Sequence, residues 1–260
     1  MGKLTVTLLS QQPFDRYRGF SPVAHPASAR DVRRLWEERL SQVPPGHPIW
    51  LYLHVPYCPQ TCAYCHCGQQ LLTDKKDLDT WVDRICAEIE FFAPVLSRTR
   101  VQQQYFGGGT PNLLADEQLD KVLTTLETHV SYDPSGRKTM EMLPSAYRPG
   151  ALKVAARHGI RRLSCGVQST VTSVLGKVAR KPDFGPLEPL MREAWERGVV
   201  DINLDLAWGF KGDSEAVLFR SLADVLTLNP TTVTVSLNAR PIFARLKQRQ
   251  GYLSLTTRTR

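Results

Sequence analysis

Four of the six cysteines of this chain lie in one short stretch, Cys58-Pro59-Gln60-Thr61-Cys62-Ala63-Tyr64-Cys65-His66-Cys67. The stretch follows the apolar run from Trp50 to Val55, whose alternating, aromatic and β-branched residues predict a strand. Four thiols therefore occupy one loop at the carboxyl end of a strand. This feature constrains the chain most, because it fixes both where a strand ends and which chemistry follows it.

The spacing within this loop is typical of a metal site. Cys58, Cys62 and Cys65 form a C-x3-C-x2-C pattern, so one looping segment can wrap three thiolates around a soft metal centre. A cubane iron–sulfur cluster has four irons, and three thiolates would leave one iron open to a ligand. Zinc is an alternative, although zinc sites usually take two separated pairs of ligands. Inert thiols that bind no metal are another alternative. The crowding of four cysteines in one loop disfavours disulfides. Cys67 is either a spare thiol near the metal or a small buried residue.

Length and charge limit the class of protein. With 260 residues, 42% of them hydrophobic, the chain fits one large domain of the α/β barrel class. It has no apolar run of membrane-spanning length and no signal-peptide core, so we expect a cytoplasmic location, which suits thiolate ligands. The net charge of +8 fits an acidic substrate, an anionic cofactor or nucleic acid. The absence of a basic motif interleaved with aromatic residues disfavours nucleic acid.

The chain divides into three parts by composition. Residues 1–49 are rich in Pro, Arg and Ser and contain one expected helix, about Ala29 to Leu40, so we interpret them as an N-terminal wrapping segment. Residues 50–243 form the expected core. Residues 244–260 form a basic C-terminal tail.

From Trp50 onward, strand-like and helix-like segments alternate. The expected strands are Trp50 to Val55, Val101 to Phe106, Lys138 to Leu143, Ile160 to Cys165, Val199 to Leu206 and Thr231 to Leu237. The expected helices are Leu78 to Phe92 ended by Pro94, one through Leu119 to Leu126, Ala151 to Arg157 closed by Gly159, Pro189 to Arg197 stopped by Gly198, and Ser214 to Leu228 with Ser214 as N-cap. Six βα repeats predict a partial, six-stranded parallel βα barrel with its chemistry in the loops after the strands.

Polar residues at the strand ends are the remaining candidates. Gly107 to Thr110 follows the second strand, where three glycines allow the backbone to approach a ligand, although a tight turn needs the same residues. Glu141 lies on the third strand, where it could accept from an ammonium group or form a structural salt bridge. Gln168 and Asp205 are polar residues in apolar strands, and buried polar groups of this kind need hydrogen-bond partners. Arg180 could bind a carboxylate, or it could be a solvated helix arginine.

Taken in order, these motifs resemble the radical S-adenosylmethionine superfamily. Within it the chain is most similar to the oxygen-independent coproporphyrinogen III oxidase family, including its heme-chaperone and methyltransferase branches. The motifs that carry the resemblance are Tyr52-Leu53-His54-Val55-Pro56-Tyr57, the three spaced cysteines, Gly107-Gly108-Gly109-Thr110-Pro111, Gly166-Val167-Gln168 and Asn203-Leu204-Asp205-Leu206. Cys67 favours the oxidase branch, whose cluster loop also carries a cysteine two residues past the third ligand.

The chain departs from the family pattern in three places. Leu143, not Asn or Asp, precedes Pro144. Trp208-Gly209-Phe210-Lys211 stands where the family tends to have Tyr-Gly-Leu-Pro. The oxidases also continue into a C-terminal domain that closes over the substrate, and we expect that domain to be absent from this chain.

The resemblance implies a site and a reaction. Cys58, Cys62 and Cys65 would hold a 4Fe-4S cluster whose open iron takes the amino and carboxylate groups of S-adenosylmethionine. The residues that it assigns to this cofactor are Tyr52, Tyr64, Gly109, Thr110, Glu141, Gln168, Arg180, Asp205 and Ala239. Reductive cleavage of the cofactor would give methionine and a 5′-deoxyadenosyl radical that abstracts hydrogen from the substrate.

The implied partners are an anionic, tetrapyrrole-like small molecule and a reduced flavodoxin or ferredoxin-type electron donor. The implied reaction is coproporphyrinogen oxidation by decarboxylation, or methylation through a second S-adenosylmethionine. A heme-carrying protein is the alternative of another class. In that case His54 or His66 could bind the heme iron, although a satisfied histidine is the simpler interpretation of both.

Overall fold

The computed structural model describes residues 28–65, 67 and 70–237. The chain forms two compact units, residues 1–44 and residues 45–260. In the first unit, helix α1 (Ala29–Ser41) begins after Ser28, whose side chain accepts a hydrogen bond from the Asp31 backbone at 3.2 Å. The Asp31 side chain accepts from the Ser28 backbone in return, which completes a capping box. The helix predicted from about Ala29 is therefore confirmed.

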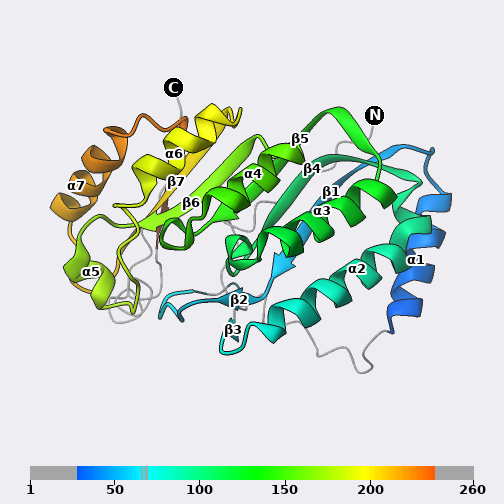
Figure 1. Cartoon of the computed structure of the whole chain (residues 1–260), viewed down its shortest axis with the longest axis horizontal. Coiled ribbons are helices and arrows are strands. Elements are labelled where there is room, and N and C mark those ends of the chain that lie inside the picture. The colour runs from blue at the N-terminus through cyan, green and yellow to red at the C-terminus, as the bar shows by residue number, and fades with distance from the viewer. Residues whose placement is uncertain (1–27, 66, 68–69, 238–260) are drawn as a thin grey trace, which may run out of the picture. The chain divides into compact units, whose positions relative to one another are not determined.

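The second unit is built on one parallel sheet of six strands (Figure 1). The strands are β1 (His47–Val55), β4 (Thr99–Gly108), β5 (Tyr132–Met142), β6 (Arg162–Gln168), β7 (Asp201–Trp208) and β8 (Thr232–Leu237), and they lie side by side in this order. Every neighbouring pair is parallel. The predicted six-stranded parallel α/β architecture is thus confirmed, and among the described residues β1 and β8 are the two edges of the sheet.

Helices cover one face of this sheet. They are α2 (Lys76–Leu96), α3 (Asp116–His129), α4 (Pro149–Arg157), α6 (Leu187–Glu196) and α7 (Glu215–Leu226). Figure 1 shows α2, α3, α4 and α6 along the same side of the strands. Their apolar faces pack with strand residues such as Phe106, Leu163 and Leu204, all fully buried, into one core. In the part of the chain that the structure describes, no helix is both long and apolar enough to cross a membrane.

Three local features differ from the predictions. Helix α2 does not end before Pro94 but continues to Leu96, so Pro94 lies in its last turn despite the backbone hydrogen bond that a proline loses there. Strand β5 begins at Tyr132, six residues before the predicted start, in a partly exposed segment with weak apolar alternation. The short elements α5 (Thr172–Gly176), β2 (Tyr57–Cys58) and β3 (Gln70–Leu71) were not predicted, because they are too short to show a periodicity.

Candidate functional site

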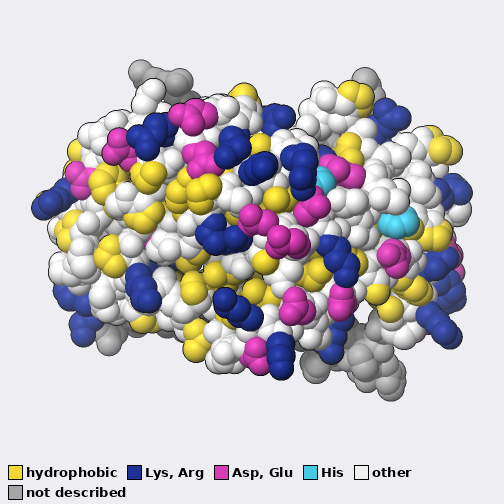
Figure 2. All heavy atoms as spheres, viewed as in Figure 1, with side chains coloured by type: hydrophobic (Ala, Val, Ile, Leu, Met, Phe, Trp, Pro, Cys, Tyr) yellow, Lys and Arg dark blue, Asp and Glu magenta, His cyan; other side chains and the backbone are white. Residues whose placement is uncertain are grey.

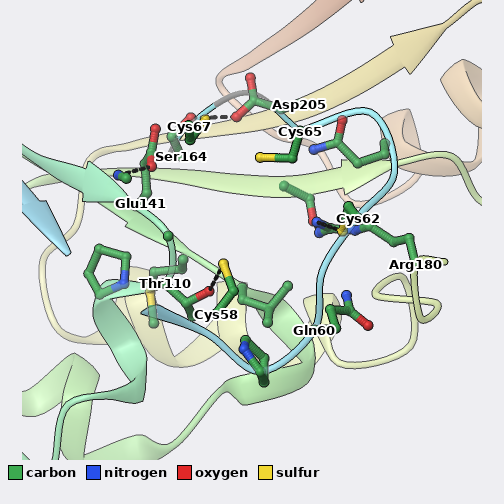
Figure 3. Close-up of a pocket in the computed structure, with 18 of the residues that line it drawn as sticks. Cys58, Gln60, Cys62, Cys65, Cys67, Thr110, Glu141, Ser164, Arg180 and Asp205 are labelled. Carbon is green, nitrogen blue, oxygen red and sulfur yellow. Dashed lines mark hydrogen bonds between the residues drawn. The ribbon is translucent and has the colours of Figure 1, made fainter. Parts of the chain in front are cut away.

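The carboxyl ends of the central strands surround a cavity of about 190 Å³ (Figure 3). The predicted site residues that line it are Cys58, Cys62, Tyr64, Cys65, Gly109, Thr110, Glu141, Gln168, Arg180 and Asp205. The structure therefore brings together residues separated by almost 150 positions in the sequence, because the carboxyl ends of parallel strands lie at the same end of the sheet.

The cysteine loop is held by short backbone contacts. Strand β2 pairs in parallel with β3, so that Cys58 lies opposite Leu71 and the loop closes on itself. The Cys65 backbone donates to the Cys62 carbonyl at 3.1 Å, and the Ala63 backbone donates to the Val178 carbonyl at 3.0 Å. All six cysteines are free thiols, so the structure holds no disulfide to compete with metal binding.

The three spaced thiols share one cavity. Among the described residues, no three His, Cys, Asp or Glu side chains converge closely enough to hold one metal ion. Cys58, Cys62 and Cys65 nevertheless line one cavity. A cubane cluster takes three such thiolates on three of its irons, so these residues fit a cluster. Burial raises the pKa of the Cys58 thiol, so binding a metal there must release its proton.

The glycine run is explained by its contact with this loop. The Gly109 backbone donates to the Val55 carbonyl at 2.6 Å, and a Cβ atom on Gly109 would overlap the Tyr57 carbonyl oxygen. Gly108 has a φ of +105°, in the left-handed region that glycine tolerates. Thr110 is then placed with its hydroxyl 3.3 Å from the Cys58 sulfur. These glycines are required because the end of β4 approaches the cysteine loop closely, and not only because the chain turns there.

Glu141 is a half-buried carboxylate with neutral partners. It accepts from the Tyr105 hydroxyl and from the Gly108 backbone, each at 2.9 Å. Burial raises its pKa above the usual value, and these two hydrogen bonds oppose the rise. Within the described residues it forms no ion pair, so the predicted alternative of a structural salt bridge is not found there. The charge of Glu141 is available to a cation in the cavity.

Asp205 belongs to a hydrogen-bonded network on the same face of the sheet. It accepts from the Ser164 hydroxyl at 2.7 Å and from the Asn203 amide at 2.8 Å, and the Thr234 hydroxyl donates to Asn203 at 2.9 Å. Gln168 ends β6 with a φ of +69°, which is uncommon for a residue with a side chain. Ser164 lines the cavity but was missed. Its polarity in an apolar strand, two residues before Gly166, could have identified it.

Arg180 is not a solvated helix arginine. It lies between α5 and α6, with only 10% of its side chain exposed. Its guanidinium donates to the Gly166 carbonyl at 2.6 Å and to the Tyr64 hydroxyl at 3.4 Å, and one nitrogen lies 3.9 Å from the Cys62 sulfur. The partner that neutralises it is Asp183, fully buried and 2.6 Å away. Sequence analysis missed this aspartate, although its position three residues after a candidate arginine is a usable signal.

Two predicted residues are not placed in the cavity. Tyr52 lies on β1 with 56% of its surface exposed, and its hydroxyl is 3.0 Å from His54 Nδ1. Its ring stacks on Tyr105 with centroids 6.0 Å apart, and it does not line the cavity. Ala239 lies outside the described residues, as does His66.

Two residues that the predicted site did not include contact its members. Cys67 lines the cavity, and its hydrogen bond with Cys65 together with burial raises the pKa of its thiol. Phe210 packs its ring against Tyr64, with centroids 4.7 Å apart.

Comparison with known proteins agrees with this geometry. The model of the Radical SAM superfamily matches residues 52–223. An oxygen-independent coproporphyrinogen III oxidase from Pseudomonas aeruginosa is 29% identical over 222 residues, which cover 84% of this chain and 46% of the relative. The heme chaperone HemW from Mycobacterium tuberculosis is 33% identical over 180 residues, or 68% of this chain and 46% of the relative.

A solved structure shares the fold. The coproporphyrinogen III oxidase HemN from Escherichia coli, described as a radical SAM enzyme, superimposes with a TM-score of 0.74 at 25% identity, over 85% of this chain and 50% of that one. The chain spans about half the length of the curated relatives it matches. With its parallel sheet, its three-cysteine loop and a family match over most of its length, the chain belongs to the radical SAM superfamily, whose cofactors are a 4Fe-4S cluster and S-adenosylmethionine.

Proposed function

We propose that this chain is the radical-generating core of an oxidoreductase that acts on an anionic tetrapyrrole of the coproporphyrinogen class. The observation that carries the proposal is the single cavity shared by the three-thiol loop and the polar strand ends. Similarity to coproporphyrinogen oxidases supports the substrate class. Cys67, which lines the same cavity, supports the oxidase branch over the chaperone branch.

Each part of the cavity has a role in this proposal. Cys58, Cys62 and Cys65 hold the cluster. When bound, the cluster and S-adenosylmethionine supply a carbon-centred radical for hydrogen abstraction. Glu141, whose described partners are neutral, would accept from the amino group of S-adenosylmethionine. Arg180 has a buried Nε without a hydrogen-bond partner among the described residues, and it donates to the carboxylate.

The other cavity residues position the same ligand. Tyr64, which packs against Phe210, would lie against the adenine, and Gly109 and Thr110 would contact the methionyl part. Gln168 and Asp205 complete the polar shell. Fixing the ligand in one orientation and excluding water from it are the contributions of the protein.

A heme carrier is the second candidate, because a heme chaperone is 33% identical to this chain over 180 residues. The Tyr52 hydroxyl lies 3.0 Å from His54 Nδ1, so in this proposal Nε2 is the His54 nitrogen that would bind the heme iron. The carrier predicts tight heme binding without S-adenosylmethionine cleavage. The oxidoreductase predicts cleavage.

The test is anaerobic reconstitution with iron and sulfide, followed by reduction with dithionite in the presence of S-adenosylmethionine. We expect 5′-deoxyadenosine, and we expect more of it when coproporphyrinogen III is added and decarboxylated. The Cys62→Ala variant is the control and should form none. Zinc in anaerobically purified protein, or iron whose spectrum does not respond to S-adenosylmethionine, would contradict the proposal.

A further inference from the structure

We propose that an acidic electron-donor protein docks on the exposed surface beside the cysteine loop. We call this surface the lysine face and define it by Lys177, Lys181 and Lys211. The inference rests on the proposed function, since a cluster that cleaves S-adenosylmethionine must first be reduced. It adds the place and the chemistry of the contact.

The lysine face is joined directly to the loop that carries the cluster ligands. The Lys181 backbone donates to the side-chain oxygen of Gln60 at 3.1 Å, and the Val178 carbonyl accepts from the Ala63 backbone at 3.0 Å. Gln60 and Ala63 flank Cys62 in the sequence. In Figure 3, Gln60 lies on the side of the cavity that Cys62 occupies. A protein bound at the lysine face therefore lies next to a cluster ligand.

The third lysine, Lys211, lies in the turn after β7. A Cβ atom on Gly212 would overlap the Lys177 ammonium nitrogen, so that ammonium group lies against the turn after β7, which also carries Lys211. All three lysines are exposed. Among the residues that the structure describes, none of the three forms an ion pair. Their charges are open to a partner.

Few acidic residues lie near these lysines in the sequence. Residues 56–73 and 164–182 contain no Asp or Glu. Asp183 is fully buried and neutralises Arg180. Near Lys211 in the sequence, Asp213 is half-buried and accepts from the Gly209 backbone at 3.0 Å, and Glu215 is exposed. The three lysines therefore stand against these two carboxylates. The face thus has a positive excess that attracts an acidic surface and speeds its association.

The loop also exposes small side chains in this region. Thr61 and Ala63 are exposed, whereas Cys62 between them is buried. A docked protein can therefore reach the backbone of the loop without displacing a large side chain. The transfer is one electron from the reduced flavin or iron–sulfur group of the donor to the cluster. The donor is oxidised by one electron, and no covalent bond forms or breaks.

The test measures how fast reduced flavodoxin bleaches the cluster of the reconstituted protein, without S-adenosylmethionine or substrate. The variant combines Lys177→Glu, Lys181→Glu and Lys211→Glu. The matched control combines Arg84→Glu, Lys153→Glu and Arg192→Glu, three exposed cations on α2, α4 and α6 with the same total change of charge. Dithionite, a small reductant, checks that each variant holds an intact and reducible cluster.

We expect the lysine-face variant to be reduced by flavodoxin about tenfold more slowly than wild type at low salt, with a weaker dependence on ionic strength. We expect the control to stay within about twofold of wild type, and dithionite to reduce all three proteins fully. Equal slowing of both variants, or no slowing of the first, would overturn the inference. Because the assay needs no turnover, a protein that is reduced normally but forms no 5′-deoxyadenosine contradicts the proposed function alone.

Discussion

Replacing Asp183 with asparagine tests whether a buried ion pair maintains the wall of the cavity. Asp183 is fully buried and lies 2.6 Å from the Arg180 guanidinium, which is itself 90% buried. Its other oxygen accepts from the Ser145 backbone at 3.0 Å. Asparagine keeps the volume and one acceptor but removes the charge, so Arg180 would be left buried without its counter-ion.

The expected cost follows from the burial of both partners. Removing one partner of a buried pair costs about 3–5 kcal/mol, because the remaining charge is desolvated and unpaired. Here the guanidinium keeps its hydrogen bonds to the Gly166 carbonyl and the Tyr64 hydroxyl, which reduces that cost. We therefore expect Asp183→Asn to lower the free energy of unfolding by about 3 kcal/mol, at the low end of the range.

Urea denaturation of the cluster-free chain under reducing, anaerobic conditions measures this loss. The matched control is Asp83→Asn, which breaks an exposed pair with Lys121 and should cost less than about 1 kcal/mol. The dependence of the free energy on urea should stay the same in both variants, since neither changes the surface exposed on unfolding. A loss below about 1 kcal/mol for Asp183→Asn, or similar losses in both variants, would refute the argument.

Three further predictions concern the cavity itself. Gly109→Ala should prevent cluster assembly, measured as iron content, because its Cβ atom overlaps the Tyr57 carbonyl oxygen. Gly185→Ala is the control and should assemble the cluster normally, because the space around Gly185 is open. Equal iron content in both variants would show that the contact between Gly109 and Tyr57 is not required. Because burial raises the Glu141 pKa above 4.5, ionising that carboxyl costs stability as the pH rises through its folded-state pKa. The Glu141→Gln variant should therefore become more stable relative to wild type as the pH rises above 4.5. A difference in free energy of unfolding between the two proteins that does not change with pH would contradict this. Cys62→Ala should lose the iron that Cys86→Ala, a core substitution on α2, retains.

The sequence was sufficient to predict the sheet and most of the cavity, because both follow from local patterns. Apolar alternation located the strands, and a polar residue in such a pattern, as at Glu141 and Asp205, points to the face away from the helices. Contacts between distant segments could not be predicted in this way. Arg180 donates to the Tyr64 hydroxyl only because the segment after α5 lies beside the cysteine loop, and Gly109 needs its small size only because β1 lies beside β4.

The charges of the cavity restrict what can bind at its base. Glu141 has neutral partners among the described residues, and Asp205 is held by a hydroxyl and an amide, so two carboxylates face the cavity without a described counter-ion. The positive charge of Arg180 is already neutralised by Asp183, and its Nε has no hydrogen-bond partner among the described residues. A polyanion placed there would meet repulsion from both carboxylates. A ligand with an amino group, a carboxylate and a sulfonium satisfies both signs, so S-adenosylmethionine suits the base of the cavity. Under the proposed function, an anionic tetrapyrrole would approach from the open side.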